Sequence, residues 1–368
     1  KLILENNQEF KGFSFGAEQS ISGEVVFNTG MVGYTESLTD PSYKGQILVL
    51  TYPLIGNYGV PDKIIDSGLE KNFESDKIQV QALVVSDYSF DYSHWNAKKS
   101  LAEWLKGENI PAIYGIDTRK LTKTLREKGA MLGKIVFDNE KIDYFDPNAV
   151  DIVKEVTIKK PIVYNERKGN KKIIVVDCGI KNNIIRNLIK RNLTVVRVPY
   201  DYDFLTEFFD GLVISNGPGD PKMCTKTIYN IGRAMKHNIP TFGICLGNQL
   251  MALAASGNTY KLKYGHHSQN QPCTLVSDSS STSKIPPTSP RTHLTKRCFI
   301  TTQNHGFAVD MKSLSDEWQE FFVNANDGTN EGLKHKTKPF MSTQFHPEST
   351  PGPYDTEFLF DEFVKMMK

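Results

Sequence analysis

The sequence has no apolar run long enough to cross a membrane. Among its 368 residues the longest runs, such as Ile47 to Leu50 and Ile173 to Val176, are as short as a β-strand. A membrane-spanning helix needs roughly 20 apolar residues. The amino end, Lys1 to Glu5, also lacks the basic, apolar and small-residue segments of a secretory signal. We therefore expect no transmembrane helix and no membrane partner.

Cysteine is scarce, and neither sign of charge dominates. The five cysteines are widely separated and odd in number, which does not suit a closed disulfide framework and favours a reducing, cytoplasmic setting. Because 44 Lys and Arg nearly balance 42 Asp and Glu, nucleic acid is not the favoured partner. The chain begins with Lys rather than Met, so we expect it to be part of a longer polypeptide.

The length indicates two domains, because one domain averages roughly 150 residues. Residues 1–146 mix short runs of β-branched residues with polar turns, which predicts a β-rich α/β domain. In this domain we expect one helix that is capped by Ser93 and ends near Gly107. A second helix is expected between Asp117 and Gly129.

A linker and a second domain follow. Charge replaces hydrophobic periodicity over residues 147–170, and in residues 171–368 strands rich in Val and Ile alternate with amphipathic helices, one of them from about Gln249. This alternation predicts a doubly wound, mostly parallel sheet, whose ligands bind at the carboxyl ends of its strands. Residues 277–297 are rich in Ser, Thr and Pro and nearly free of apolar residues, which predicts a disordered insertion.

The strongest chemical signal is Gly243-Ile244-Cys245-Leu246-Gly247, where a buried strand gives way to a helix. This Gly-x-nucleophile-x-Gly spacing is typical of a nucleophile elbow, with Cys in place of Ser. The sharp turn strains the backbone and needs glycines beside it, because a Cβ would block the neighbouring chains. The helix amino terminus favours the reactive thiolate. A buried structural cysteine is the alternative, which the flanking glycines make the weaker interpretation.

A thiolate nucleophile needs a proton carrier, and Gln344-Phe345-His346-Pro347-Glu348 offers one. Side chains two apart in an extended segment share a face, so Glu348 can orient His346 as the base. His305 is a competing base, and a histidine that is merely satisfied in a loop is the structural alternative. The turn Asn216-Gly217-Pro218-Gly219-Asp220 follows another strand, and its N–H groups, with that of Leu246, can hold an oxyanion.

The remaining motifs are weak. The pair His266-His267 lacks the further ligands and the spacing of a zinc site, so no metal is expected. The chain has no Gly-x4-Gly-Lys-Ser/Thr phosphate loop, since the nearest approach, Gly129 to Lys134, has the wrong spacing. We therefore expect no cofactor in this chain.

Cys245 and the His-Pro-Glu sequence resemble the class I, or triad, glutamine amidotransferases. Three further segments look like the amino-terminal domain of the carbamoyl phosphate synthetase small subunit. They are Glu24 to Glu36, Leu38 to Tyr43 and Asp117 to Thr122. The resemblance extends across nearly the whole chain apart from the Ser/Thr-rich insertion. It implies an α/β fold in which a class I glutamine amidotransferase domain follows the small-subunit domain.

The resemblance also implies a reaction. Cys245 attacks the carboxamide carbon of glutamine, His346 moves the proton, Glu348 orients the imidazole, and water hydrolyses the γ-glutamyl thioester. The family residues that hold glutamine map onto Ser42, Gly217, Gly219, Leu246, Gln249, Asn304, Gly306 and Phe307.

In this family the ammonia passes through a tunnel to a larger synthetase, separate or fused, which uses bicarbonate and ATP with Mg to make carbamoyl phosphate. The resemblance therefore implies such a partner and a role in the pyrimidine or arginine pathway. Two departures stand out. Asn248 replaces the family's usual His, so a polar donor remains while a titrating group is lost, and residues 277–297 replace a short turn. Glutaminase chemistry should persist, because the motif assigns acid-base work to His346.

Three interpretations compete. The first is the glutaminase part of a carbamoyl phosphate synthetase. The second, an amidotransferase for another synthetase or a cysteine hydrolase of similar fold, does not account for residues 1–145. The third, a catalytically silent subunit that only stabilises its partner, does not account for the retention of Cys245, His346 and Glu348.

Overall fold

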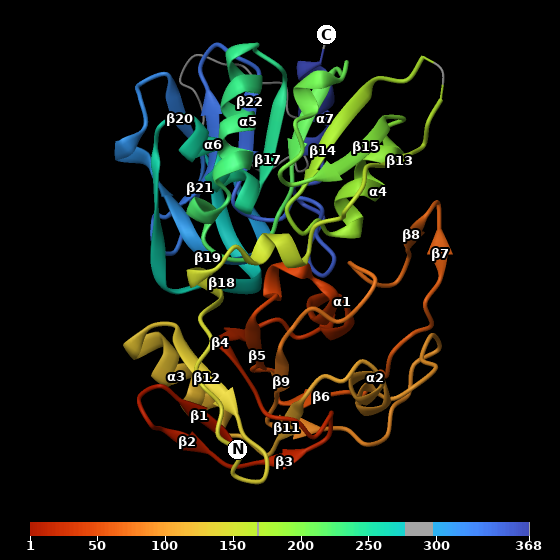
Figure 1. Cartoon of the computed structure of the whole chain (residues 1–368), viewed down its shortest axis with the longest axis vertical. Helices are drawn as coiled ribbons and strands as arrows, with labels where there is room; N and C mark the ends of the chain where they lie inside the picture. Colours follow the sequence, from red (N-terminus) through yellow and green to blue (C-terminus); the bar gives the residue numbers. More distant parts are fainter. Residues whose placement is uncertain (168, 277–296, 368) are drawn as a thin grey trace.

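The computed structural model describes residues 1–167, 169–276 and 297–367. The chain folds into two halves, one above the other in Figure 1, and each half is built on its own β-sheet. Of the predicted insertion at 277–297, only Arg297 belongs to the described residues, so the prediction of disorder lies outside them. In the described part of the chain, no helix is long and apolar enough to cross a membrane.

The first half is an eight-stranded mixed sheet in the order β2-β1-β12-β4-β5-β9-β11-β3. Its centre is parallel from β4 to β11, and the outer strands are antiparallel. The strands are β1 (Leu2–Leu4), β2 (Glu9–Phe10), β3 (Phe13–Ser14), β4 (Ile21–Asn28), β5 (Gln46–Leu50), β9 (Ala82–Val84), β11 (Ala112–Tyr114) and β12 (Met131–Ile135). Two short pairs lie beside it, β6 (Leu54–Ile55) with β10 (Asp87–Tyr88) and β7 (Ile65–Asp66) with β8 (Leu69–Glu70). The predicted mixed, β-rich α/β character is confirmed.

Helices cover both faces of this sheet because successive strand residues point to opposite sides. The helix α2 (Leu101–Gly107) buries its apolar side against one face, and α3 (Thr118–Lys128) buries Leu121 and Leu125 against the other. A short helix, α1 (Tyr34–Thr39), follows β4 and leads into the 3-10 turn η1 (Pro41–Tyr43). The predicted bounds of α3, Asp117 and Gly129, are confirmed as its N-cap and C-cap.

The predicted cap of α2 at Ser93 is wrong. The helix is capped instead by Ser100, whose hydroxyl accepts the N–H of Glu103 while the Glu103 carboxylate accepts the N–H of Ser100. This reciprocal capping box satisfies two backbone donors at once, so it is the stronger local signal. The helix therefore starts at Leu101.

The second half is a ten-stranded sheet in the order β13-β15-β14-β16-β17-β22-β21-β20-β18-β19. Strands β15, β14, β16, β17 and β22 run parallel, as the Val- and Ile-rich segments predict. Their bounds are β14 (Lys172–Asp177), β15 (Thr194–Pro199), β16 (Gly211–Ile214), β17 (Thr241–Ile244) and β22 (Phe340–Thr343).

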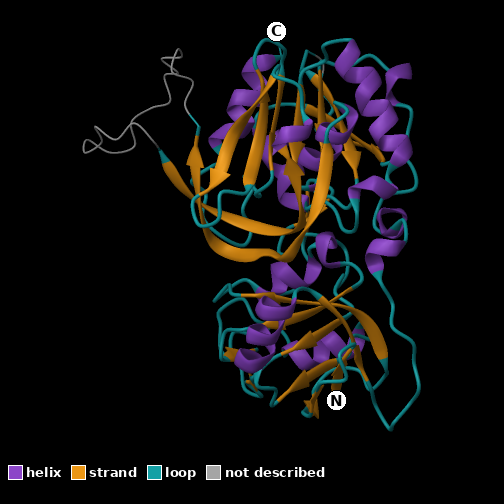
Figure 2. Cartoon of the chain, turned by 90° about the vertical axis from the view of Figure 1, so that its left-hand side faces the viewer, coloured by secondary structure: helices purple, strands orange, loops and turns teal. Residues whose placement is uncertain are grey.

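Two helices lie on each face of the parallel strands (Figure 2), so the doubly wound prediction is confirmed. One face carries α4 (Asn182–Lys190) and α7 (Phe358–Met366), and the other carries α5 (Thr225–Lys236) and α6 (Leu246–Ala254). The helix predicted from about Gln249 begins earlier, at Leu246, because it starts directly after the turn at Cys245. Three 3-10 turns connect or follow these elements, η4 (Phe204–Thr206), η5 (Pro221–Met223) and η6 (Met311–Ser313).

An antiparallel extension, which the sequence patterns did not foresee, completes the second sheet. It consists of β18 (Asn258–Leu275), β19 (Cys298–Asp310), β20 (Trp318–Asn324) and β21 (Asn330–His335). The long strands β18 and β19 curve along the boundary between the halves (Figures 1 and 2). Their register shifts between Lys261 and His266, where Gly265 adopts φ 69°. This bulge carries β18 across the first half.

The segment predicted as a linker, residues 147–170, packs against both halves. It contains the 3-10 turns η2 (Pro147–Ala149) and η3 (Ile152–Glu155) and the strand β13 (Ile162–Tyr164), which pairs antiparallel with β15. Ile152 lies against Gly45 in the first half and against Gly219 in the second. The connection therefore helps to hold the two halves together.

Candidate active site

Cys245 occupies the turn between β17 and α6. Its backbone has φ 56° and ψ −105°, a conformation that non-glycine residues rarely adopt, and the residue is 2% exposed. As the N-cap of α6, it places its thiol at the positive end of the helix dipole. The N–H of Leu246, the first helical residue, has no partner within the helix. The predicted strained strand-to-helix turn is therefore present.

The glycines around Cys245 are required by close approach of the backbone. A Cβ on Gly243 would lie 2.6 Å from the carbonyl oxygen of Gly247, and one on Gly247 would lie 2.2 Å from that of Ile214. In the facing loop, a Cβ on Gly217 would lie 2.0 Å from the carbonyl oxygen of Cys178. Any side chain at these positions would push the turn away from the sheet.

His346 and Glu348 form a buried hydrogen-bonded pair. His346 Nδ1 lies 2.7 Å from Glu348 Oε1, and the ammonium of Lys181, also buried, lies 3.0 Å from the same oxygen. Burial alone would raise the pKa of Glu348, but Lys181 and His346 outweigh it and lower the pKa to about 2. Glu348 is therefore ionised and accepts a hydrogen bond from the imidazole.

The other nitrogen of His346, Nε2, has no hydrogen-bond partner in the described part of the chain. Burial lowers the pKa of His346, but Glu348 and then Cys245 outweigh burial and raise the pKa to about 10. The thiol of Cys245 lies 3.5 Å from the carbonyl oxygen of Asn304, to which it donates. A protonated imidazole next to a thiol is the electrostatic setting that activates cysteine nucleophiles.

His305, the competing base, is differently placed. Its Nδ1 lies 3.0 Å from the carbonyl oxygen of Phe307, so this nitrogen carries the proton and donates it to the backbone. Burial lowers the pKa of His305, although Glu331 opposes the change. An imidazole already committed to a backbone carbonyl is less suited to proton transfer than His346 with its carboxylate partner.

A small pocket beside Cys245 holds a cavity of about 30 Å³. Seven of the eight residues predicted to bind glutamine line it: Ser42, Gly217, Gly219, Gln249, Asn304, Gly306 and Phe307. The eighth, Leu246, packs its side chain toward Gly217 and does not line the pocket. The cavity has the volume of about one water molecule, so side chains must move before an amino acid fits.

Both halves build this pocket. The hydroxyl of Ser42, in η1 of the first half, accepts a hydrogen bond from the amide of Asn216 at 2.9 Å. The carboxylate of Asp40 accepts one from the amide Nδ2 of Asn304 at 3.0 Å, while His267 Nδ1 lies 2.7 Å from the other end of that amide. Asn304 is thus held from two sides, in one orientation.

Three of these supporting residues escaped the sequence analysis. Lys181 precedes α4 and belongs to no chemical motif, so only its contact with Glu348 reveals it. His267 was considered only as a metal ligand together with His266. Asp40 lies within the segment that carries the family resemblance, which was the one available signal.

Asn248, the departure from the family pattern, lies outside the pocket and is fully buried. Its Nδ2 donates to the side-chain oxygen of Gln344 at 3.0 Å, and its Oδ1 accepts from the hydroxyl of Ser342 at 2.8 Å. Asn248 therefore ties α6 to β22 and its end through a satisfied hydrogen-bond network.

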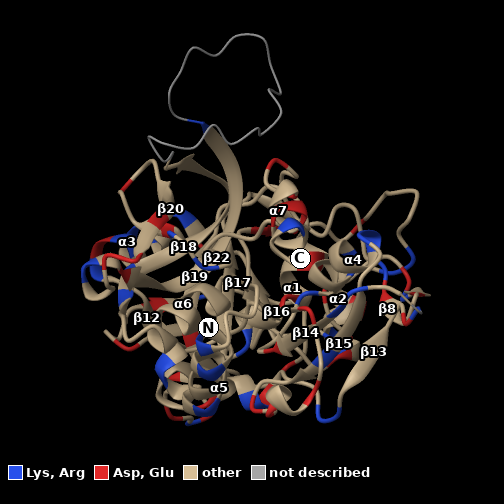
Figure 3. Ribbon diagram, turned by 90° about the horizontal axis from the view of Figure 1, so that it is seen from above, with Lys and Arg blue, Asp and Glu red and all other residues tan. Residues whose placement is uncertain are grey.

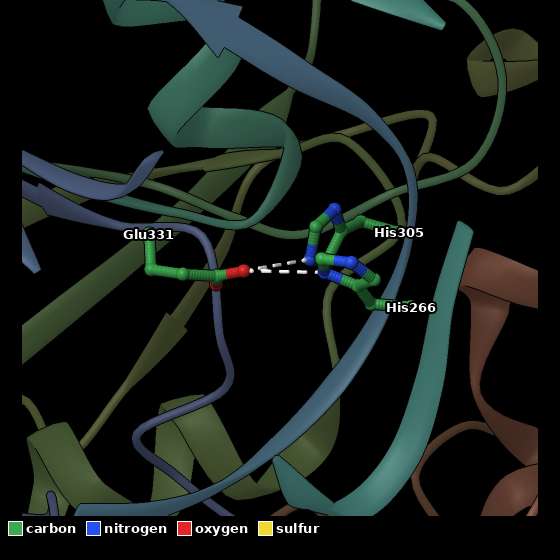
Figure 4. A group of neighbouring side chains, drawn as sticks. All are labelled: His266, His305 and Glu331. Atoms are coloured by element: carbon green, nitrogen blue, oxygen red, sulfur yellow. Dashed lines mark hydrogen bonds and ion pairs between the residues drawn. The ribbon is translucent and has the colours of Figure 1, made fainter. Parts of the chain in front are cut away.

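Figure 4 shows a second buried group, in which His266, His305 and Glu331 point toward one another. Their potential ligand atoms lie within 4.8 Å, and Glu331 Oε1 lies 3.3 Å from His266 Nδ1 and 3.5 Å from His305 Nε2. His266 also contacts Asp327 at 2.8 Å. Mutual hydrogen bonds and charge account for this imidazole–carboxylate cluster, which joins β18, β19 and β21. The sequence analysis did not foresee it, because it depends on the pairing of His266 with His305 across two strands.

Two family models match the chain. The model for "Glutamine amidotransferase class-I" matches residues 174–366, and the model for "Carbamoyl-phosphate synthase small chain, CPSase domain" matches residues 2–135. The two matches coincide with the two sheets and agree with the resemblance inferred from the motifs.

Curated proteins match the chain along nearly its whole length. It is 48% identical over 99% of its length to "Multifunctional protein pyr1-3" of Dictyostelium discoideum, of which it covers 17%. It is 52% identical over 99% of its length to "Multifunctional protein CAD" of Squalus acanthias, of which it covers 16%. It is 47% identical over its full length to "Carbamoyl-phosphate synthase [ammonia], mitochondrial" of Homo sapiens, of which it covers 24%.

The chain therefore spans about a quarter or less of these relatives. Its second half has the doubly wound sheet, the cysteine elbow and the family match over more than half of all residues. On these findings the chain belongs to the class I glutamine amidotransferase family, and its first half matches the carbamoyl-phosphate synthase small-chain domain.

Proposed function

We propose that this chain hydrolyses L-glutamine to glutamate and ammonia through a thioester on Cys245, and that it supplies the ammonia to a carbamoyl phosphate synthetase. The proposal rests on one observation: Cys245 stands in a strained elbow next to the ionised His346–Glu348 pair, at a pocket built by both halves. The small-chain match and the name of the Homo sapiens relative support the destination of the ammonia.

The first half-reaction forms the thioester. The Sγ of Cys245 attacks the carboxamide carbon of glutamine, and the carbonyl oxygen becomes an oxyanion. The N–H groups of Leu246 and of the loop at Gly217 are the donors proposed to hold this oxyanion. His346 then gives a proton to the nitrogen, the C–N bond breaks and ammonia leaves, while Glu348 stabilises the imidazolium from which that proton comes.

The second half-reaction restores the enzyme. His346 takes a proton from water, the resulting hydroxide attacks the thioester carbon, and the bond between carbon and Sγ breaks. Cys245 returns as the thiolate, and glutamate leaves. The sum is glutamine plus water giving glutamate plus ammonia, and it requires no cofactor.

The synthetase partner, whether a separate subunit or a fused domain, is proposed to carry the chemistry of bicarbonate, ATP and Mg. The carbamoyl phosphate formed there would enter the pyrimidine or the arginine pathway. The participation of Ser42 and Asp40 in the pocket supports an active role for the small-chain half, because glutamine would bind where that half meets the amidotransferase half.

Glutamate release tests the proposal, first with the chain alone and then with a synthetase partner. In the assembled enzyme, Cys245→Ala should abolish carbamoyl phosphate formation from glutamine and leave formation from an ammonium salt intact. Loss of both activities would mean that Cys245 is structural. Continued synthesis from glutamine in the variant would refute the proposed nucleophile.

A catalytically silent subunit is the second interpretation, and the Homo sapiens relative, whose name specifies ammonia, gives it a basis. Under this interpretation the wild-type chain would release no glutamate, even in the assembly, although it would still stabilise its partner. The same assay therefore separates the two.

A further inference from the structure

Acidic and basic side chains are interspersed over the molecule (Figure 3), and one oppositely charged pair stands within the candidate pocket. Glu24 on β4 and Lys261 on β18 both line that pocket, and Lys261 Nζ lies 2.7 Å from Glu24 Oε1. Since β4 belongs to the first half and β18 to the second, this ion pair bridges the two halves at the site.

The two partners differ in how firmly they are held. Glu24 is nearly buried, and its carboxylate also accepts hydrogen bonds from the amides of Gln46, at 2.9 Å, and Asn148, at 3.2 Å. Lys261 has a side chain that is 42% exposed, and among the described residues Glu24 is its one ion-pair partner. Lys261 can therefore swing away while Glu24 stays in place.

Lys261 is also tied to the predicted glutamine-binding segment. In the β18–β19 ladder it stands directly opposite Phe307, one of the residues predicted to hold glutamine. Neighbouring cross-strand side chains share one face of a sheet. The ammonium and the predicted substrate contacts therefore belong to the same wall of the pocket.

The pair closes a space that its charges suit. With the pair intact, the cavity holds only about 30 Å³, whereas free glutamine brings an α-ammonium and an α-carboxylate that both need partners. Separation of Glu24 from Lys261 would enlarge the pocket and expose one charge for each end of the zwitterion. Two ion pairs would then replace one, with no change in total charge.

We propose that Glu24 and Lys261 form a charge gate that selects the zwitterionic end of glutamine, with Glu24 binding the α-ammonium and Lys261 the α-carboxylate. This inference rests on the proposed function and adds a basis for substrate specificity. An amide that lacks either charge leaves one member of the gate unpaired in a largely buried pocket, and such groups are costly.

Two glutamine analogues test each half of the gate separately. Glutaramic acid keeps the carboxylate and lacks the α-ammonium, while 4-aminobutanamide keeps the ammonium and lacks the α-carboxylate. Their inhibition constants against glutamine hydrolysis are compared with the KM for glutamine in wild type, Glu24→Gln and Lys261→Met. Lys263→Met is the matched control, because Lys263 is exposed on the same strand and does not line the pocket.

Each variant should lose one preference only. In Glu24→Gln the preference for glutamine over glutaramic acid should fall roughly tenfold to a hundredfold, and in Lys261→Met the preference over 4-aminobutanamide should fall by a similar factor. The other preference should survive in each variant, and Lys263→Met should match wild type. Unchanged preferences, or equal weakening of all three compounds, would overturn the gate. Failure of wild type to hydrolyse glutamine would instead overturn the proposed function.

Discussion

At the residue scale, Gly306 allows the pocket to be altered without disturbing the fold. Nothing lies within 4 Å of the position that its Cβ would take, and Gly306 lines the pocket with Cys245. Gly306→Ala should therefore leave the urea midpoint of unfolding unchanged. It should raise the KM for glutamine about tenfold, because one misplaced methyl group in a fitted site costs roughly 1–3 kcal/mol.

Gly247→Ala is the control for that change. Its Cβ would lie 2.2 Å from the carbonyl oxygen of Ile214, so this variant should lower the unfolding midpoint. Steady-state kinetics and urea unfolding of both variants supply the comparison. A wild-type KM in Gly306→Ala would contradict the placement of glutamine in this pocket.

The His346–Glu348 pair should stabilise the fold most between pH 4.5 and 6.5. The pKa of Glu348 is lowered from 4.5, so its contribution is present above pH 4.5 and is lost as the pH falls toward 2. The pKa of His346 is raised from 6.5, so its contribution is complete below pH 6.5 and is lost as the pH rises toward 10. Glu348→Gln removes the carboxylate and should therefore destabilise the protein most in this window.

Urea unfolding of wild type and Glu348→Gln at about pH 5.5 and about pH 8.5 measures this difference. The loss of unfolding free energy in the variant should be larger at the lower pH. An equal loss at both values would mean that the two groups are not a charged pair in the folded protein.

The reacting residues could be recognised from the sequence because their geometry restricts the neighbouring residues. Gly243 and Gly247 are required by the close approach of the backbone around Cys245, so the spacing of glycines marks the elbow. Lys181 and Glu24 leave no such mark, since each acts through a partner distant in sequence. Their roles emerge only when the fold brings Lys181 to Glu348 and Glu24 to Lys261.

At the element scale, the start of α2 depends on one capping box. Ser100→Ala removes the hydroxyl that accepts the N–H of Glu103, and loss of an N-cap costs about 1 kcal/mol. Urea unfolding should show this loss, while glutaminase kinetics stay at wild-type values. Ser93→Ala is the matched control and should have no effect. A larger cost at Ser93 than at Ser100 would contradict the observed helix boundary.

Strands and helices with a clear hydrophobic pattern were predictable, and those without one were not. The parallel strands of the second half are continuous Val and Ile runs, so β14 to β17 emerged from the sequence. Strand β18 mixes exposed and buried residues without a regular alternation, because it crosses the boundary between the halves and bends at Gly265. No single period describes such a strand.

At the scale of the whole molecule, a buried ion pair fastens the two halves. Glu74 of the first half is fully buried, accepts the N–H of Asn183 near the start of α4 at 2.9 Å, and lies 3.2 Å from Arg186 Nη1. Arg186→Met should cost about 2–3 kcal/mol, less than the roughly 3–5 kcal/mol of a wholly buried pair, because Arg186 is partly exposed.

Urea unfolding of Arg186→Met measures that cost. Arg191→Met is the control, since Arg191 pairs with Asp361, whose side chain is 52% exposed, and exposed pairs contribute about 0–1 kcal/mol. Equal losses in the two variants would show that the contact between the halves is not specially stabilised by the Glu74 pair.

The two-part plan of the molecule was predictable from its length and its change of pattern, whereas the contact between the parts was not. Hydrophobic periodicity reports which face of an element is buried, but it does not report the partner of a polar side chain. Ser42 entered the predicted site only through the family resemblance, and its hydrogen bond with Asn216 shows how the first half reaches the pocket.

The central claim is that Cys245 carries the acyl group of glutamine during turnover. Mass spectrometry of the chain, acid-quenched while it hydrolyses glutamine with its synthetase partner, tests this most directly. The account predicts a γ-glutamyl group on the peptide that contains Cys245, and neither this group nor glutamate release in Cys245→Ala. Glutamate release at the wild-type rate in that variant, or an acyl group on another residue, would contradict the account.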